Sequence, residues 1–467
     1  MAIDDPVKGI EEAPAAPTAE TPRSTWSALR PLLLRIHFYA GVLVAPVLLV
    51  AAVTGLLYSL SFQAEKYVYS HELTTEVGDR TLPLAAQVAA ARTAHPEGTV
   101  TAVLPSAEAG ATTRVLMSSP EVEEGTSLAV FVDPYTGRVR GELADSFGAL
   151  PLRAWLSGLH SNLHLGEAGR IYSELAASWL WVVALGGVLL WIGRKRASKR
   201  ALLVPARGAQ GRRRTLSWHG SVGLWAVAGL VALSATGLTW SAYAGEHIGT
   251  VQDRLGGATP TVSAALRAGG GDGHEGDAHQ GPDVGIDEAV EAAAARGVEG
   301  AVSVTLPSDG NGYVVKETDR QFPVHLDSVA IDPSDGTVVD ELRFDDYPLL
   351  AKLTRIGIDA HMGTYLGLAN QLALAALALA LIMLIVWGYR MWWLRRPTKS
   401  RTFGVGRPMP RGAWRRVPLP VLLPLAAVTA LVGWFVPLLG ISLAAFLVLD
   451  VVLGLVARSR AGAGAGA

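Results

Sequence analysis

Two apolar segments of the chain carry histidine, glycine and threonine at the same spacing. In each, a glycine follows the histidine after four residues and a Thr-Gly pair follows it after seventeen: His37, Gly41 and Thr54-Gly55 in the first segment, and His219, Gly223 and Thr236-Gly237 in the second. An ionisable side chain in or beside a membrane span is costly, so it usually faces a bundle interior or a functional cavity. The repeated depth therefore indicates a shared role for the two histidines.

Further histidines occupy matching positions when segments 152–166 and 349–363 are aligned without gaps. The alignment places His164 on His361, whereas His160 falls on Gly357. His160 and His164 are four residues apart and would share a helix face, a spacing that also suits zinc. We expect His164 to be the ligand, and His160 to be a neighbouring contact or an alternative ligand.

The positions of these histidines predict one pair at each membrane face. His37 and His219 would lie at one face, and His164 and His361 at the other. Two imidazoles from facing helices can supply both axial ligands of one haem iron, so two pairs predict two haems. Gly41 and Gly223, one turn from a ligand, would leave a flat patch for a porphyrin. The alternative is four interfacial histidines held by lipid headgroups and backbone carbonyls.

The composition is that of a membrane protein. Of 467 residues, 50% are hydrophobic and only 17% are charged, and the mean hydropathy is +0.31. There are no cysteines, which excludes disulfides, thiolate metal sites, cysteine-ligated iron–sulfur clusters and covalent haem attachment. Redox chemistry would therefore need histidine, carboxylate or a non-covalently held cofactor.

Six apolar segments are candidates for membrane spans, at about 36–60, 173–193, 217–241, 366–392, 417–436 and 438–457. Two connecting loops are rich in Lys and Arg and contain no acid. By the positive-inside rule these loops are cytoplasmic, as are both termini, and the acid-rich segments between spans are extracytoplasmic. Glu174, near the outer end of the second span, is expected to meet Arg170 one turn away.

The two extracytoplasmic segments resemble each other. Segments 130–143 and 329–342 align without a gap and share an Asp-Pro-x-x-Gly turn between two strand patterns, which predicts a hairpin in each. An alanine-rich helical pattern precedes each hairpin. Together with the histidine repeats, these matches indicate an internal duplication.

We therefore expect a mainly α membrane protein: a duplicated four-helix transmembrane core, two small α+β extracytoplasmic modules and an extra C-terminal transmembrane hairpin. The expected order is a disordered cytoplasmic tail (1–27), the first span (28–60), module 1 (61–150), the second span with an outer interfacial helix (151–193), a basic cytoplasmic loop (194–216), the third span (217–241), a linker and module 2 (242–348), the fourth span with an outer interfacial helix (349–393), a second basic loop (394–416), the hairpin (417–457) and a tail (458–467).

The motifs "RIHFYAG", "LHSNLHLG", "SWHGSVG" and "DAHMG", with the two Asp-Pro-x-x-Gly modules, resemble the PepSY-associated transmembrane proteins, whose best-understood kind is a ferric-siderophore reductase of the bacterial inner membrane. The resemblance covers about residues 28–397. It implies two b-type haems with paired ligands at His37, His164, His219 and His361, and electron passage outward to ferric iron.

The resulting hypothesis is a transmembrane electron conduit. A cytoplasmic or quinol donor would supply electrons, and an extracytoplasmic ferric chelate would accept them. Membrane lipid would surround the helices, and no nucleic-acid partner is expected. No side chain is expected to act as a catalytic acid, base or nucleophile. Bis-histidine ligation saturates the iron and favours electron transfer over oxygen binding. The alternative is a non-catalytic membrane sensor or peptidase regulator, whose outer modules bind peptide.

Overall fold

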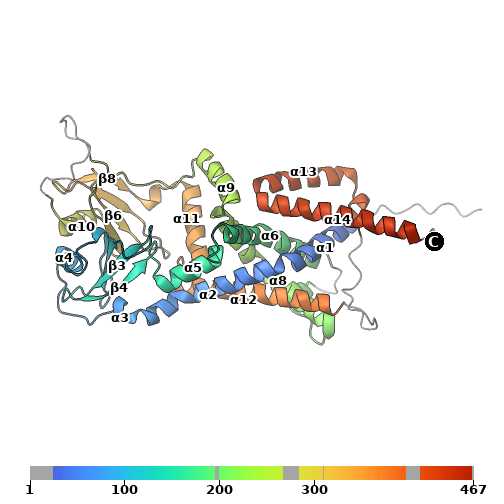
Figure 1. The fold of residues 1–467 in the computed structure, drawn as a ribbon, viewed down its shortest axis with the longest axis horizontal. Coiled ribbons are helices and arrows are strands. Elements are labelled where there is room, and N and C mark those ends of the chain that lie inside the picture. The colour runs from blue at the N-terminus through green and yellow to red at the C-terminus, as the bar shows by residue number, and fades with distance from the viewer. Residues whose placement is uncertain (1–24, 195–198, 267–282, 309, 396–410, 465–467) are drawn as a thin grey trace, which may run out of the picture.

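The computed structural model describes residues 25–194, 199–266, 283–308, 310–395 and 411–464 (Figure 1). The fold is mainly helical, with an antiparallel sheet at one end of a helical bundle. The principal helices of the bundle and its flanks are α1 (Thr25–Leu43), α2 (Ala45–Val68), α5 (Pro151–Asn162), α6 (Gly166–Ile192), α8 (Gly211–Thr239), α9 (Tyr243–Arg254), α11 (Leu349–Met362), α12 (Gly367–Trp393), α13 (Leu419–Phe435) and α14 (Pro437–Gly464). Shorter helical segments are α3 (Ser70–Leu73), α4 (Leu84–Ala94), α7 (Arg200–Leu203), α10 (Ile286–Ala294), η1 (Phe344–Asp346) and η2 (Ala413–Arg416).

Five helices of the described chain are long and apolar enough to cross a membrane: α2, α6, α8, α12 and the part of α14 from Pro437 to Ala457. The chain is thus a multi-pass membrane protein. Six spans are expected from the sequence, but α13 has only 17 residues. At 1.5 Å per residue such a helix is about 25 Å long, shorter than the hydrocarbon layer of about 30 Å.

The first predicted span is broken rather than continuous. α1 begins at Thr25, within the predicted tail, and ends at Leu43, and α2 continues to Val68, well past the expected end at Leu60. Pro46 lacks the N–H that would bond the carbonyl of Val42, so a helix is weakened there. The Tyr389 hydroxyl donates to this Val42 carbonyl at 2.9 Å. The Val42 carbonyl that the break leaves without a helical partner is therefore hydrogen-bonded by a side chain of α12.

The core of the bundle is formed by α2, α6, α8 and α12, with α6 packed on α8, and α12 packed on both α2 and α8. The C-terminal hairpin of α13 and α14 lies on the outside of this core (Figure 1). Trp179 of α6 donates to Ser442 of α14 at 2.9 Å, and Arg35 of α1 forms an ion pair with Asp450 of α14. Polar contacts thus attach the hairpin to the core at two depths.

The strands of the two segments that were expected to be extracytoplasmic modules form one sheet rather than two. Its order is β4-β3-β2-β1-β5-β6-β7-β8, and every neighbouring pair is antiparallel. The strands are β1 (Thr99–Leu104), β2 (Thr113–Ser118), β3 (Ser127–Val132), β4 (Val139–Asp145), β5 (Val302–Thr305), β6 (Tyr313–Glu317), β7 (Ser328–Ile331) and β8 (Val338–Leu342). Each predicted module supplies four consecutive strands, and they meet where β1 pairs with β5. This pairing covers an edge that each module would expose alone.

Both predicted hairpins are present, as β3–β4 and β7–β8. In the first, Asp133 accepts the backbone N–H of Tyr135 at 2.8 Å, and Gly137 has a φ of +73°, which favours glycine. In the second, Asp332 accepts the N–H of Ser334 at 2.8 Å and Gly336 has a φ of +72°. Helices α4 and α10 cover one face of the sheet over a shared core of Val, Ala and Ile. The opposite face looks toward α5 and α11 (Figure 1).

Candidate functional site

The inner histidines come together between the two halves of the bundle. His37 of α1 and His219 of α8 have ring centres 6.3 Å apart, with the ring planes inclined by 74°. The Nδ1 atom of His37 lies 3.0 Å from the Val183 carbonyl of α6, and that of His219 lies 3.0 Å from the Leu384 carbonyl of α12. Because a carbonyl only accepts, Nδ1 carries the proton in each ring. Each neutral ring therefore keeps its lone pair on Nε2, the atom available to a metal.

The separation of the inner rings suits a shared metal ion. Imidazole nitrogens bind first-row metals at about 2 Å, and the ring centre lies about 1.2 Å behind the nitrogen, so two rings on opposite sides of one ion have centres about 6.3 Å apart. His37 and His219 lie at this separation. A Cβ added to Gly41, one turn from His37, would meet no heavy atom within 4 Å, and one added to Gly223, one turn from His219, would be 3.6 Å from Leu384, so both glycines leave open space on their helices. The residues present therefore fit a bis-histidine haem.

The outer histidines that come together are His160 of α5 and His361 of α11. The Nδ1 of His160 lies 2.9 Å from Thr54 Oγ1, and the Nδ1 of His361 lies 2.6 Å from Thr236 Oγ1. Each threonine hydroxyl donates its only proton to a carbonyl of its own helix. It must therefore accept from the histidine, so Nδ1 again carries the proton and Nε2 again keeps the lone pair.

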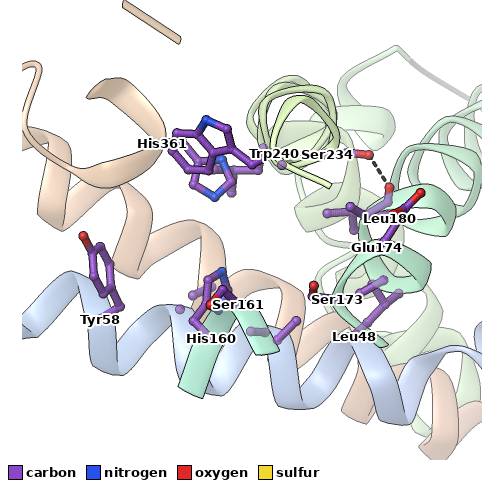
Figure 2. A pocket seen from close by; sticks show the side chains of 18 of the residues that line it. Leu48, Tyr58, His160, Ser161, Ser173, Glu174, Leu180, Ser234, Trp240 and His361 are labelled. Atoms are coloured by element: carbon purple, nitrogen blue, oxygen red, sulfur yellow. Dashed lines mark hydrogen bonds between the residues drawn. The ribbon is translucent and has the colours of Figure 1, made fainter. Parts of the chain in front are cut away.

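His160 and His361 line the same cavity, which has a volume of about 380 Å³ (Figure 2). This is in the range of about 300–1,000 Å³ found for small-molecule and cofactor sites. The walls are mainly apolar side chains of α2, α6, α8 and α12, among them Leu48, Leu180, Leu230, Leu377 and Leu381. Gly55 packs against His160, because an added Cβ would lie 3.1 Å from its Cε1, and a Cβ added to Gly237 would lie 3.7 Å from Cε1 of His361. An apolar slot between two imidazoles again fits a haem.

Both outer histidines lie outside the helices that are long and apolar enough to span a membrane, and both line the cavity. Burial lowers the pKa of His160. Burial, together with the neighbouring His160, lowers the pKa of His361 to about 4. Both imidazoles are therefore neutral near pH 7, the state that binds a metal.

His164, the ligand expected from the ungapped alignment, does not face His361. Its side chain is exposed, stacks on Trp155 with ring centres 5.2 Å apart, and donates from Nε2 to the Trp155 carbonyl at 2.9 Å. The equivalence fails because α5 and α11 differ in length, with 12 and 14 residues. Counted back from the following spans, which begin at Gly166 and Gly367, His160 and His361 both stand six residues earlier.

The same contacts recur in both halves of the chain at constant offsets. His37 and His219 are 182 residues apart, as are Thr54 and Thr236. Their partners are 201 residues apart: Val183 and Leu384 for the inner rings, and His160 and His361 for the outer rings. The sequence did not lead us to expect hydrogen bonds between these threonines and the outer histidines. The repeated Thr-Gly pair was the signal that could have indicated them.

Glu174 has a different role from the expected pairing with Arg170. Its buried carboxylate accepts the backbone N–H groups of Tyr243 and Ala244, each at 3.0 Å, at the first turn of α9. Arg170 instead pairs with Glu167 at 3.1 Å. The carboxylate thus satisfies N–H groups that a helix start leaves without partners. It fixes α9 beside the outer cavity, which Glu174 also lines.

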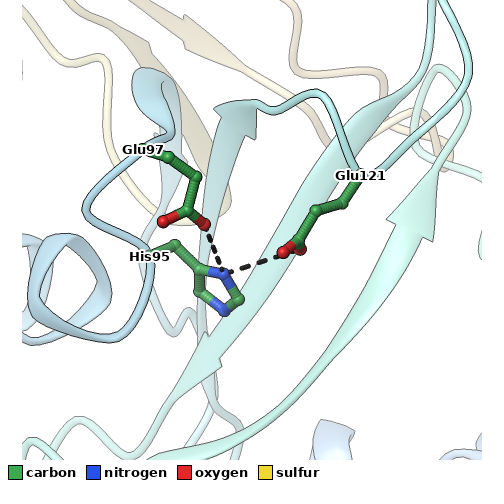
Figure 3. Close-up of side chains that lie close together, drawn as sticks. All are labelled: His95, Glu97 and Glu121. Carbon is green, nitrogen blue, oxygen red and sulfur yellow. Dashed lines mark ion pairs between the residues drawn. The ribbon is translucent and has the colours of Figure 1, made fainter.

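A separate histidine cluster lies in the sheet domain, where His95 follows α4 (Figure 3). Its Nδ1 lies 3.6 Å from Glu97 and 3.8 Å from Glu121, and its Nε2 lies 2.5 Å from Glu142. The three carboxylates are exposed to solvent. Carboxylates contact both ring nitrogens, so contacts within the protein account for the cluster, and we assign no metal to it.

Comparison with known proteins identifies the family. A search of curated protein sequences finds no match to this chain. The family model described as the PepSY-associated TM region matches residues 34–395. This range includes the whole sheet and the paired histidines His37, His160, His219 and His361. The chain therefore belongs to the PepSY-associated transmembrane family.

Proposed function

We propose that the protein carries electrons across the membrane through two b-type haems, one held by His37 and His219 and the other by His160 and His361. The observation that supports this most strongly is the common arrangement of the four imidazoles. Each forms a hydrogen bond through Nδ1 and leaves Nε2 free, and the rings are grouped in two pairs. When bound, a haem supplies reversible one-electron chemistry at iron.

The chain's own residues orient the ligands and keep water from them. The carbonyls of Val183 and Leu384 and the hydroxyls of Thr54 and Thr236 set the tautomer and the direction of each ring. Such partners of a metal-ligating histidine also raise its basicity. The apolar side chains around the outer cavity limit access of solvent, which tunes the reduction potential.

The direction of transfer in this proposal is outward. The basic loops favour a cytoplasmic location for one end of the bundle, and the proposal therefore has the sheet on the extracytoplasmic side of a bacterial inner membrane. The inner haem, which His37 and His219 would hold, would take electrons from a cytoplasmic or quinol donor, and a ferric chelate, such as a ferric siderophore, would be the acceptor beside the sheet. Because the chain has no cysteine, Phe147→Cys and Arg200→Cys test this orientation: an impermeant maleimide should label the first in intact cells and the second only after lysis.

We further propose that the two halves arose by internal duplication and that the sheet is a fusion of two PepSY-like modules. The constant offsets of 182 and 201 residues between equivalent contacts support a duplicated origin. The central β1–β5 pairing joins strands from the two halves.

The functional test is electron transfer by the purified protein. Dithionite should reduce the bound haem, and adding a ferric chelate under anaerobic conditions should reoxidise it and yield Fe(II), detected with a ferrous-specific chelator. A redox-inert gallium chelate is the matched control and should leave the haem reduced. Reduced haem that persists in the presence of every ferric chelate tested would contradict the proposed acceptor.

A further inference from the structure

Four cations lie near one another where the sheet meets the helices on the outer side of the bundle: Arg153 of α5, Lys316 of β6, Arg320 of the β6–β7 loop and Arg355 of α11. We call them the junction cluster. In β6, Val315 is fully buried in the core beneath α4 and α10. Side chains alternate along a strand, so Lys316 projects from the opposite face, toward α5 and α11.

The position of Arg320 is fixed by the loop that carries it. The N–H of Phe322 donates to the Tyr365 carbonyl at 2.9 Å, and the two rings are in contact, with centres 6.1 Å apart. Asp319 accepts the N–H of Gln321 at 2.9 Å. These contacts attach the loop to the turn between α11 and α12. They leave the Arg320 guanidinium 4.0 Å from the buried Asp359 carboxylate.

Positive charge exceeds negative charge in the junction cluster. Asp359 is fully buried and binds Arg355 through both oxygens, at 2.8 and 2.6 Å. Glu65 pairs with Arg153 at 3.2 Å. Arg320 shares Asp359 only at 4.0 Å, and within the described part of the chain Lys316 has no carboxylate within that distance.

The excess charge acts on the cations themselves. Burial, followed by Arg355 and Arg320, lowers the pKa of Lys316. Burial and then the neighbouring Arg355 also lower the pKa of Arg320. An added anion would relieve this repulsion, so the cluster favours a negatively charged ligand.

The junction cluster lies beside the outer histidine cavity without being part of its lining. Arg153 shares α5 with His160, and Arg355 shares α11 with His361. Tyr58 lines the cavity, and Arg153 and Arg320 both interact electrostatically with its hydroxyl. None of the four cations is among the residues that line the cavity. A ligand on the cluster would therefore be adjacent to the outer cavity and separate from its occupant.

We propose that the junction cluster binds the electron acceptor and that this acceptor is an anionic iron(III) chelate whose free carboxylates contact Lys316 and Arg320. This inference rests on the proposed function, since it names the class of acceptor for the outer haem. The haem that His160 and His361 would hold would supply one electron, its iron going from Fe(II) to Fe(III), and the chelated Fe(III) would become Fe(II). Carboxylates are the anions that arginine and lysine bind by charge-assisted hydrogen bonds.

The test is direct binding of gallium(III) citrate, a redox-inert probe, by calorimetry to the full-length protein in phosphatidylcholine nanodiscs. The K316Q/R320Q variant should bind about tenfold more weakly or worse, since two charge-assisted contacts are lost. The matched K199Q/R200Q variant removes the same charge from an exposed site in the basic loop and should bind like the wild type. The cationic gallium complex of desferrioxamine B should bind more weakly than the citrate complex.

Equal binding of gallium citrate by K316Q/R320Q and the wild type would overturn the inference. Nanodiscs containing phosphatidylglycerol distinguish a lipid site: if that lipid abolishes citrate binding to the wild type, the cluster binds lipid phosphate and the inference fails. Haem content, read from the absorbance of the same samples, separates the two proposals. Citrate binding that depends on Lys316 and Arg320 in a protein without haem would sustain the anion site and refute the electron path.

Discussion

At the scale of single residues, the threonines decide which nitrogen of the outer histidines can bind a metal. Thr54 and Thr236 donate to their own helices and so accept from Nδ1 of His160 and His361. Backbone carbonyls do the same for His37 and His219. Two chemically different acceptors thus produce the same tautomer at both membrane faces.

The first prediction concerns these threonines. Thr54→Val or Thr236→Val removes the acceptor while preserving side-chain shape, so affinity for the outer haem should fall by about 10- to 100-fold. Titration of haem into haem-depleted protein measures this change. Thr54→Ser retains the hydroxyl and should bind like the wild type. Thr429→Val, on the exposed face of α13, should also have no effect. Unchanged haem affinity in both valine variants would show that the hydroxyls do not orient the rings.

The sequence indicates the site residues only in part. The spacings of His37, His219 and the Thr-Gly pairs could be read directly, because each pair lies on helices of matching pattern. The choice between His160 and His164 could not. That choice depends on where α5 ends. The helix ends at Leu163, whose φ is +53°, whereas the residues that usually mark a helix end with positive φ are glycine and asparagine.

At the scale of elements, the C-terminal hairpin is attached to the core by polar side chains on apolar helices. Asp450 of α14 pairs with the buried Arg35 and, at 2.9 Å, with Arg411. At the other end of the hairpin, His247 of α9 stacks on Trp434 with ring centres 5.4 Å apart. The hairpin was expected as an addition outside the repeat, but its attachment to α1, two residues before His37, could not be inferred from composition.

The second prediction tests this attachment. Asp450→Asn removes the carboxylate that pairs with the buried Arg35. Because Asp450 is itself partly exposed, we expect the free energy of unfolding to fall by about 2–4 kcal/mol. Thermal unfolding in detergent, followed by circular dichroism, should show a lower midpoint. Ser459→Ala, an exposed change further along the same helix, is the control. An unaltered midpoint for Asp450→Asn would mean that the hairpin is held by apolar packing alone.

At the scale of the whole molecule, the two halves share both a helical core and a sheet. The helices and hairpins were predictable because hydropathy and the Asp-Pro-x-x-Gly turns are local signals. The joining of the two modules was not predictable. The paired strands β1 and β5 are about two hundred residues apart, and no local sequence signal in either strand indicates which strand it pairs with. The result is a single eight-stranded sheet at the end of the bundle that holds the outer histidines.

The third prediction tests the shared sheet. Ala102 and Thr305 are partners across the β1–β5 pair, so cysteines there would be close enough to form a disulfide. The chain has no other cysteine, and loss of both free thiols under oxidising conditions measures the bond. The control pair, Ala102→Cys with Ser328→Cys, places the second thiol on β7, two strands further, and should remain reduced. Free thiols in the Ala102/Thr305 variant would indicate two separate modules.

The central claim, that paired histidines hold two haems, is tested most directly by counting haem per chain from reduced-minus-oxidised spectra of purified wild type, His160→Ala and His164→Ala. We predict two haems in the wild type, one after His160→Ala, and two after His164→Ala, because only the ring of His160 faces His361 across the cavity. A wild-type protein without haem, or loss of a haem on His164→Ala but not on His160→Ala, would contradict the account.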